Sequence, residues 1–134
     1  MKTTMFFLAL TLGFLTSNLS AQIISVRSTE QAVTDNNLKT IFVNESAYFT
    51  FDFTKKLVTL KTISESGSSS HIYTFKILKM YSEQTILGET TNLIVSSGNF
   101  PLATRIYYSD LHGGAIWIDT NAYTITYKGL TLME

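Results

Sequence analysis

Cysteine is absent from the 134-residue sequence, and proline occurs only once. The lack of cysteine excludes a disulfide framework, thiolate metal ligands, a cysteine nucleophile and lipid attachment through cysteine. Because no proline-rich or low-complexity linker divides the chain, we expect a single domain. Such a domain is stabilised by its hydrophobic core alone, which a chain of roughly 110 residues is long enough to form.

An excess of charge of either sign is also missing, since 10 Lys and Arg residues balance 10 Asp and Glu residues. There is therefore no basic field to attract nucleic acid or anionic lipid, and we expect no nucleic-acid partner. The sequence also lacks the glycine-rich phosphate loop, the nucleophile elbow and the zinc-binding helix motif of common enzymes. We expect no cofactor, no metal and a domain that is not an enzyme.

The first 21 residues have the pattern of a secretory signal peptide. Lys2 forms a short positive region, an apolar run extends from Met5 to Leu15, and a small residue follows at Ala21. The run is shorter than the roughly 18 residues that a membrane-spanning helix needs. We expect cleavage after Ala21, a mature domain of residues 22–134 without a membrane anchor, and a secreted or periplasmic location typical of bacterial exported proteins.

The segment "YFTFDFTKKLVTLKT", from Tyr48 to Thr62, alternates apolar and polar residues. Phe49, Phe51 and Phe53 lie on one face, and a short turn at residues 54–56 precedes a second alternating arm. A period of two is that of a half-buried strand, so the segment predicts a β-hairpin with one core face and one wet face.

The rest of the chain continues in the same style, with strands separated by loops rich in small residues. Strands are expected at His71–Met80, Asn92–Ser97, Thr104–Ser109, Ala115–Asp119 and Tyr123–Lys128. About seven short strands of this kind predict an all-β fold, either an antiparallel β-sandwich or a partly open barrel. Two segments with helix-start patterns, Ser28–Val33 and Ser82–Leu87, are candidates for short helices. The alternative for each is a loop or, for Ser28–Val33, the edge of a strand.

Trp117 is the first candidate for a binding residue. If Ile116 and Ile118 face the core, alternation places Trp117 on the outer face of its strand, where Tyr107 is a candidate neighbour. An exposed pair of aromatic rings stacks sugars and anchors protein partners. The alternative is that a second layer covers Trp117.

The loop "SDLHGG" supplies two further candidates, Asp110 and His112. An aspartate and a histidine on a glycine-containing loop suit ligand binding or acid–base chemistry, although turn formation explains the same residues. A metal site needs three or four ligands, which this loop does not supply.

Three functions remain open from the sequence. The first is a binding module for a glycan, a small apolar ligand or a surface protein. It uses either the aromatic pair or a cavity lined by aromatic residues, which would be Phe49, Phe51, Phe53, Tyr73, Phe75, Tyr123 and Tyr127. The second is a structural or assembly protein that associates through exposed strand edges. The third is a small hydrolase with Asp110, His112 and Asp119 as its catalytic groups. The binding module is the preferred hypothesis.

Overall fold

The chain forms nine β-strands and no helix within the residues that the computed structural model describes, which are 23–86, 88–100, 103–109 and 114–133. The all-β prediction is confirmed, but the strands are more numerous than expected, and four of them have ten or more residues. They are β1 (Ile23–Asp35), β2 (Thr40–Val43), β3 (Glu45–Asp52), β4 (Leu57–Ser64), β5 (Ser70–Thr85), β6 (Gly88–Ser97), β7 (Ala103–Ser109), β8 (Ala115–Thr120) and β9 (Tyr123–Met133). The described part of the chain contains no helix long and apolar enough to cross a membrane.

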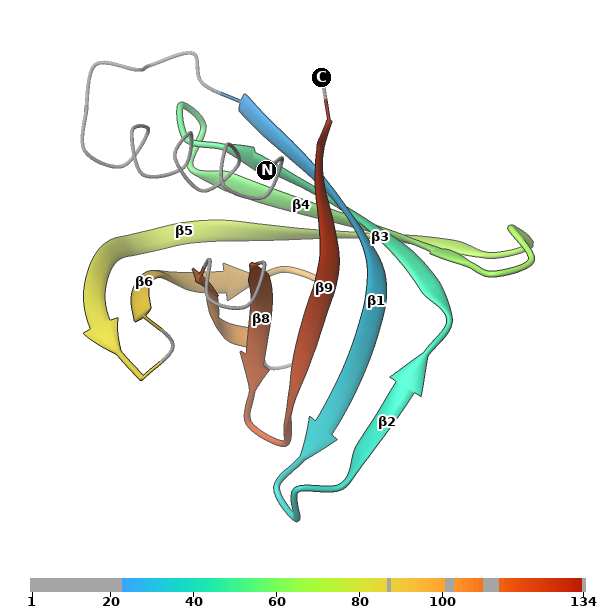
Figure 1. Ribbon diagram of the computed structural model, residues 1–134. Helices are drawn as coiled ribbons and strands as arrows, with labels where there is room; N and C mark the ends of the chain where they lie inside the picture. Colours follow the sequence, from blue (N-terminus) through green and yellow to red (C-terminus); the bar gives the residue numbers. More distant parts are fainter. Residues whose placement is uncertain (1–22, 87, 101–102, 110–113, 134) are drawn as a thin grey trace.

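Eight of the strands form a closed antiparallel barrel, and β2 is the one extra strand. From β3 to β9 each strand pairs with the next in the sequence, and β1 pairs with both β3 and β9. The pairing of β1 with β9 closes the ring, as Figure 1 shows. β2 pairs with the C-terminal half of β1.

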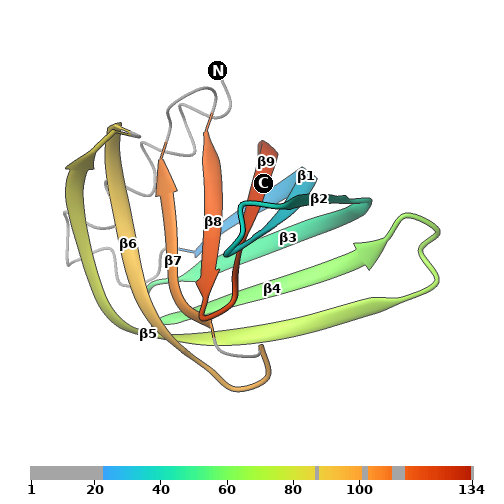
Figure 2. The same cartoon turned by 90° about the horizontal axis from the view of Figure 1, so that it is seen from below.

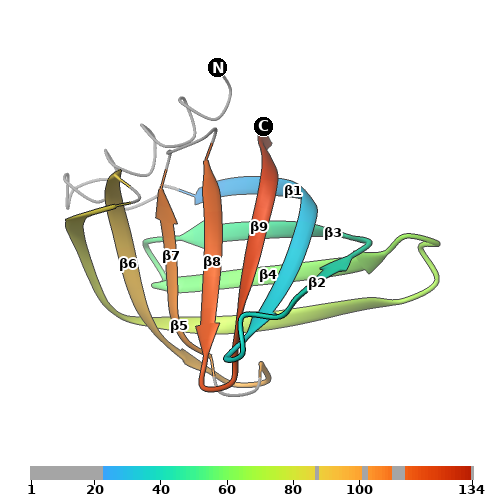
Figure 3. The ribbon, with the colours of Figure 1, turned by 60° about the horizontal axis from the view of Figure 1, so that its bottom comes forward.

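The closed sheet is arranged as two crossing layers. Figures 2 and 3 show β6 to β9 running across β3, β4 and the first part of β5. β1 and β5 bend and so belong to both layers, which is how strands form the corners of orthogonally packed sheets. In β5 the bend coincides with a register shift between Ile77 and Lys79, and β-bulges of this kind bend a strand.

The corner of β1 is formed by Ser28 and Thr29. The buried Ser28 hydroxyl lies 2.6 Å from the carbonyl oxygen of Lys128 in β9 and 3.0 Å from that of Glu30. Between the two β1 pairings, two residues of β1 lie opposite three residues of the β2–β3 segment, because Ser28 pairs with Ala47 while Gln31 pairs with Val43. The β2–β3 segment therefore has one extra residue at this corner.

Both helix predictions are wrong over the described residues, because the polar groups that suggested helix caps bond across the sheet. Residues 28–33 belong to β1, where the Ser28 hydroxyl is hydrogen-bonded within the sheet. Residues 82–86 continue β5 and the turn after it, and the Glu83 carboxylate accepts a hydrogen bond from Asn92 in β6. Leu87 lies outside the described residues.

The core lies between the two layers and confirms the predicted hairpin. Phe49 and Phe51 of β3 are fully buried, and the β4 residues of the returning arm, Val58 and Leu60, are buried beside them. Phe53 is partly buried and packs against this cluster. The other layer contributes fully buried residues from β6 to β9, among them Leu93, Ile106, Tyr108, Ile116, Ile118 and Tyr127.

Candidate functional site

Trp117 and Tyr107 lie together on the outer face of β7 and β8, as alternation predicted. Ile116 and Ile118 are fully buried, and Trp117 between them is half-buried. Tyr107 is the cross-strand partner of Trp117, and their rings stack with centroids 5.1 Å apart and an interplanar angle of 12°. The Arg105 guanidinium lies 4.2 Å from the centre of the Tyr107 ring.

A hydrogen-bond network ties the polar groups around this aromatic pair to one another. One Asp119 oxygen accepts hydrogen bonds from Arg105 Nε and Nη2, at 3.1 and 2.6 Å. The other accepts from Thr124 at 2.8 Å and from the Tyr107 hydroxyl at 3.4 Å. Arg105 Nη1 also donates to the buried Asn92. These contacts join four strands from β6 to β9, so the network has a clear structural role.

The tyrosines of this region predict a loss of stability in alkali. Burial, followed by the Asp119 carboxylate, raises the pKa of Tyr107 to about 12 from an ordinary value of 10. Burial also raises the pKa values of Tyr108 and Tyr127. Above pH 10 the unfolded chain loses phenolic protons that the native chain keeps, so we expect the free energy of unfolding to fall from pH 10 towards pH 12.

Urea unfolding at pH 9, 10 and 11 measures this loss, and Tyr107→Phe should make the decline shallower. Absorbance titration at 295 nm is the direct check on the native protein. If all seven tyrosines ionise together near pH 10 while the protein stays folded, the burial argument is wrong.

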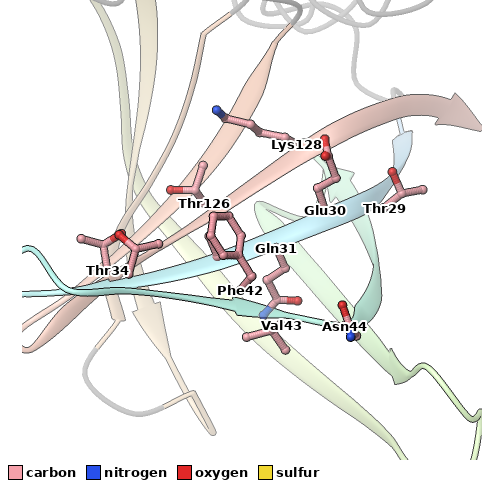
Figure 4. A pocket seen from close by; sticks show the side chains of 11 residues that line it. Thr29, Glu30, Gln31, Thr34, Phe42, Val43, Asn44, Thr126 and Lys128 are labelled. Carbon is pink, nitrogen blue, oxygen red and sulfur yellow. The ribbon is translucent and has the colours of Figure 1, made fainter.

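The outer face of β1 and β9 carries a groove of about 520 Å³ next to β2. Figure 4 shows the Phe42 side chain reaching from β2 across β1 towards Thr126, with Glu30 and Lys128 further along the groove. Phe42 is 82% exposed. Ala32 also lines the groove, so small residues lie beside the aromatic ring.

The groove and the aromatic pair belong to one row of residues across the outer face. Cross-strand partners connect Tyr107 to Trp117, Trp117 to Thr126, Thr126 to Ala32, and Ala32 to Phe42. Three aromatic residues are therefore aligned across the strands, with two small residues between Trp117 and Phe42.

A second concave site lies at one end of the barrel, and we call it the mouth. Because neighbouring strands are antiparallel, the ends of β1 and β4 and the starts of β3, β5 and β9 meet there. The pocket has a volume of about 380 Å³. Its lining is Gln31, Val33, Glu45, Thr62, His71, Tyr73, Phe100, Tyr123, Ile125 and Tyr127.

The aromatic wall of the mouth is held by the loop between β6 and β7. The Ser97 hydroxyl oxygen accepts a 2.6 Å hydrogen bond from the backbone N–H of Phe100. Asn99 donates to the Ile72 carbonyl at 2.8 Å and so attaches the loop to β5. Phe100 consequently packs edge-on against Tyr73, with ring centroids 4.9 Å apart.

The polar side chains that line the mouth are those of Gln31, Glu45, Thr62, His71 and three tyrosines. The Gln31 side-chain oxygen is buried and has no hydrogen-bond partner among the described residues. Burial raises the pKa of Tyr127, and so do the Glu45 carboxylate and the nearby Tyr73 and Tyr123.

The predicted site residues have different outcomes. Trp117 and Tyr107 are brought together on the outer face, but their role in ligand binding stays a prediction. Asp110 and His112 lie outside the described residues, so their role stays a prediction as well. Asp119 is part of the network with Arg105 and is committed to structural hydrogen bonds.

Sequence reasoning identified only part of the mouth. Tyr73, Tyr123 and Tyr127 were among the aromatics proposed to line a cavity, and they do line the mouth. The phenylalanines of that set instead fill the core or pack against it: Phe49, Phe51, Phe53 and Phe75. Glu45 and Phe100 were not identified, although an asparagine before Phe100 is a recognisable loop signal.

Comparison with known proteins gives no match, because no protein family, curated protein or solved structure is significantly similar to this chain. Within the described residues no group of three or more His, Cys, Asp or Glu side chains is placed to hold a metal ion.

Proposed function

We propose that this protein is an exported, non-enzymatic binding module that works as a small barrel and takes a small ligand in its mouth. The observation that carries the proposal is the set of aromatic side chains around the mouth, which Tyr73, Phe100, Tyr123 and Tyr127 supply. Small-ligand sites are typically concave, rich in aromatic residues and equipped with a few polar groups, and barrel mouths are a common place for them.

The residues that line the mouth favour the mouth, rather than the larger outer groove, as the ligand site. Among the described residues Phe42 is the only aromatic one that lines the groove, whereas four Tyr or Phe rings and a histidine line the mouth. The mouth is also held in shape by two hydrogen bonds, one that Ser97 accepts from Phe100 N–H and one that Asn99 donates to the Ile72 carbonyl. A preorganised site loses less conformational entropy when the ligand binds.

An NMR titration of the isotope-labelled protein tests the proposal. The probes are benzyl alcohol, benzyltrimethylammonium, hexanoate and a disaccharide, which represent four ligand classes. We expect at least one to shift the backbone amides of Gln31, Glu45 and Tyr123. The same probe at about 100 times its Kd should stabilise the fold by roughly 2.7 kcal/mol, which is several degrees in Tm.

The control compares two tyrosines that are buried to a similar extent. Tyr123→Ala removes a half-buried ring from the mouth and should abolish the shifts, whereas Tyr48→Ala removes a half-buried ring from the outer face of β3 and should preserve them. Shifts confined to the groove residues, or no shifts with any probe, would contradict a ligand site at the mouth.

A second candidate function, association through a strand edge, is favoured by β2. In the described part of the chain β2 pairs with β1 alone, so its other edge has no strand partner. Ile41 is 59% exposed, and neither it nor its neighbours in β2 carry a charge. An uncharged, apolar free edge is suited to pairing with another strand.

We propose a second copy of the chain as the occupant, in an antiparallel pairing with Phe42 opposite Phe42. This register also places Lys39 of one copy near Glu45 of the other, so the charges are complementary. Sedimentation velocity from 10 μM to 1 mM should show a weak dimer, because only three residues of each β2, Ile41 to Val43, pair in this register. Ile41→Lys should leave a monomer, and concentration-independent sedimentation of the unmodified chain would refute this candidate.

A further inference from the structure

We infer that the mouth selects an organic cation, and specifically a methylated ammonium group. The inference rests on the proposed function, since it names the ligand class of the same site. It is carried by the combination of aromatic side chains and an acidic residue in one pocket, where none of the described lining residues is a lysine or arginine.

The aromatic side chains come from separate parts of the chain and meet around the pocket. Tyr73 is on β5, Phe100 is in the loop between β6 and β7, and Tyr123 and Tyr127 are on β9. Tyr73 and Phe100 are in edge-to-face contact, which holds their two rings at a large angle. Several aromatic faces around one cavity attract a cation through their quadrupoles, and methylated ammonium groups are recognised in this way.

The charge of the pocket points to the same ligand class. Glu45, the first residue of β3, lines the mouth, and after burial its carboxylate is the next cause of the raised pKa of Tyr127. Gln31 contributes a buried side-chain oxygen that has no partner among the described residues. A neutral ligand leaves the carboxylate without a counter-charge, and an anion is repelled by it, whereas a cation is attracted both by the carboxylate and by the rings.

The volume of the mouth also suits such a ligand. About 380 Å³ lies within the range of small-molecule sites and is ample for a trimethylammonium group with a short substituent. A methylated ammonium group is weakly hydrated compared with a primary ammonium group, so an aromatic pocket compensates more readily for the loss of its water.

Choline and its uncharged isostere 3,3-dimethylbutan-1-ol test the inference, because the two differ mainly in charge. We expect choline to bind about tenfold more tightly, which is in the range of cation–π stabilisation in a partly desolvated site. Calorimetric titration gives both affinities, and amide shifts at Tyr123 and Glu45 locate the binding.

Variants of Glu45 separate the contribution of its carboxylate to choline binding from that of the aromatic rings. Glu45→Gln should weaken choline binding several-fold and leave dimethylbutanol binding unchanged, whereas the exposed Glu89→Gln should change neither. Glu45→Asp retains the charge, and it should retain most of the preference, which covers the case in which the glutamine variant folds poorly. Circular dichroism confirms that each variant is folded.

The outcomes distinguish the inference from the function on which it rests. If dimethylbutanol or benzyl alcohol binds the mouth as tightly as choline, the site is a small-ligand site but the selection of a cation is wrong. Choline binding that maps elsewhere, or that Glu45→Gln leaves unchanged, also overturns the inference. If no probe binds at the mouth, the proposed function fails together with it.

Discussion

Phe49→Ala is expected to destabilise the domain by about 3 to 5 kcal/mol, a large fraction of the stability of an ordinary small domain. Phe49 is completely buried at the centre of β3. Its ring contacts Tyr127 of the opposite layer edge-on, with centroids 4.8 Å apart, and stacks on Phe51 at 5.9 Å. Truncation therefore leaves a cavity between the two layers that the rigid, closed sheet cannot collapse to fill.

Urea unfolding at neutral pH gives the free energies, and Phe42→Ala is the matched control. It deletes the same atoms from a ring that is 82% exposed, so we expect a change within about 0.5 kcal/mol. If Phe49→Ala and Phe42→Ala lower the free energy of unfolding equally, either β2 contributes to the core or the layers are not packed through Phe49.

Gly129→Ala is expected to cost about 2 to 3 kcal/mol and to lower Tm by roughly 10 °C. Gly129 of β9 has φ of +64°, a left-handed conformation that a residue with a Cβ adopts at a cost. A Cβ at this position would also collide with the Thr29 hydroxyl at the corner of β1. That hydroxyl is 3.4 Å from the Gly129 carbonyl oxygen, so the two strands approach closely at the bend.

Two comparisons separate the backbone strain at Gly129 from the collision. In a Thr29→Ala background the collision is removed, and Gly129→Ala should then cost only about 1 to 2 kcal/mol. Gly98→Ala, where a Cβ meets nothing within 4 Å and φ is not positive, should be neutral or slightly stabilising. Differential scanning calorimetry measures Tm for the unmodified protein, the three single variants and the double variant. A neutral Gly129→Ala would show that the corner of β1 is loosely packed.

The sequence predicted those parts of the fold that depend on local alternation. Phe49 and Phe51 were assigned to the core because every second residue of their strand is apolar, and the structure confirms this. Ser28 was misread because its pattern resembles a helix cap, while its hydroxyl is used by Lys128, 100 residues away. A contact over such a distance leaves no local signal. β2 was missed since its four residues are too short to show a period.

In the candidate site, too, only the parts that depend on local alternation were predicted. The outward orientation of Trp117 followed from its buried neighbours Ile116 and Ile118, so its stacking on Tyr107 was predictable. The mouth, in contrast, is assembled from strand ends that only the closed topology brings together. Glu45 and Phe100 are ordinary residues in their own segments, and their shared pocket depends on the order of the strands.

The pairing of β1 with β9 has a consequence for how the chain folds. From β3 to β9 each pairing joins consecutive strands, so these hairpins have low contact order and form early. The seam between β1 and β9 joins the two ends of the domain, for which the entropy of loop closure is largest. We expect the pairing of β1 with β9 to form last. Once it has formed, the hairpins are joined into one cooperative unit that unfolds as a whole.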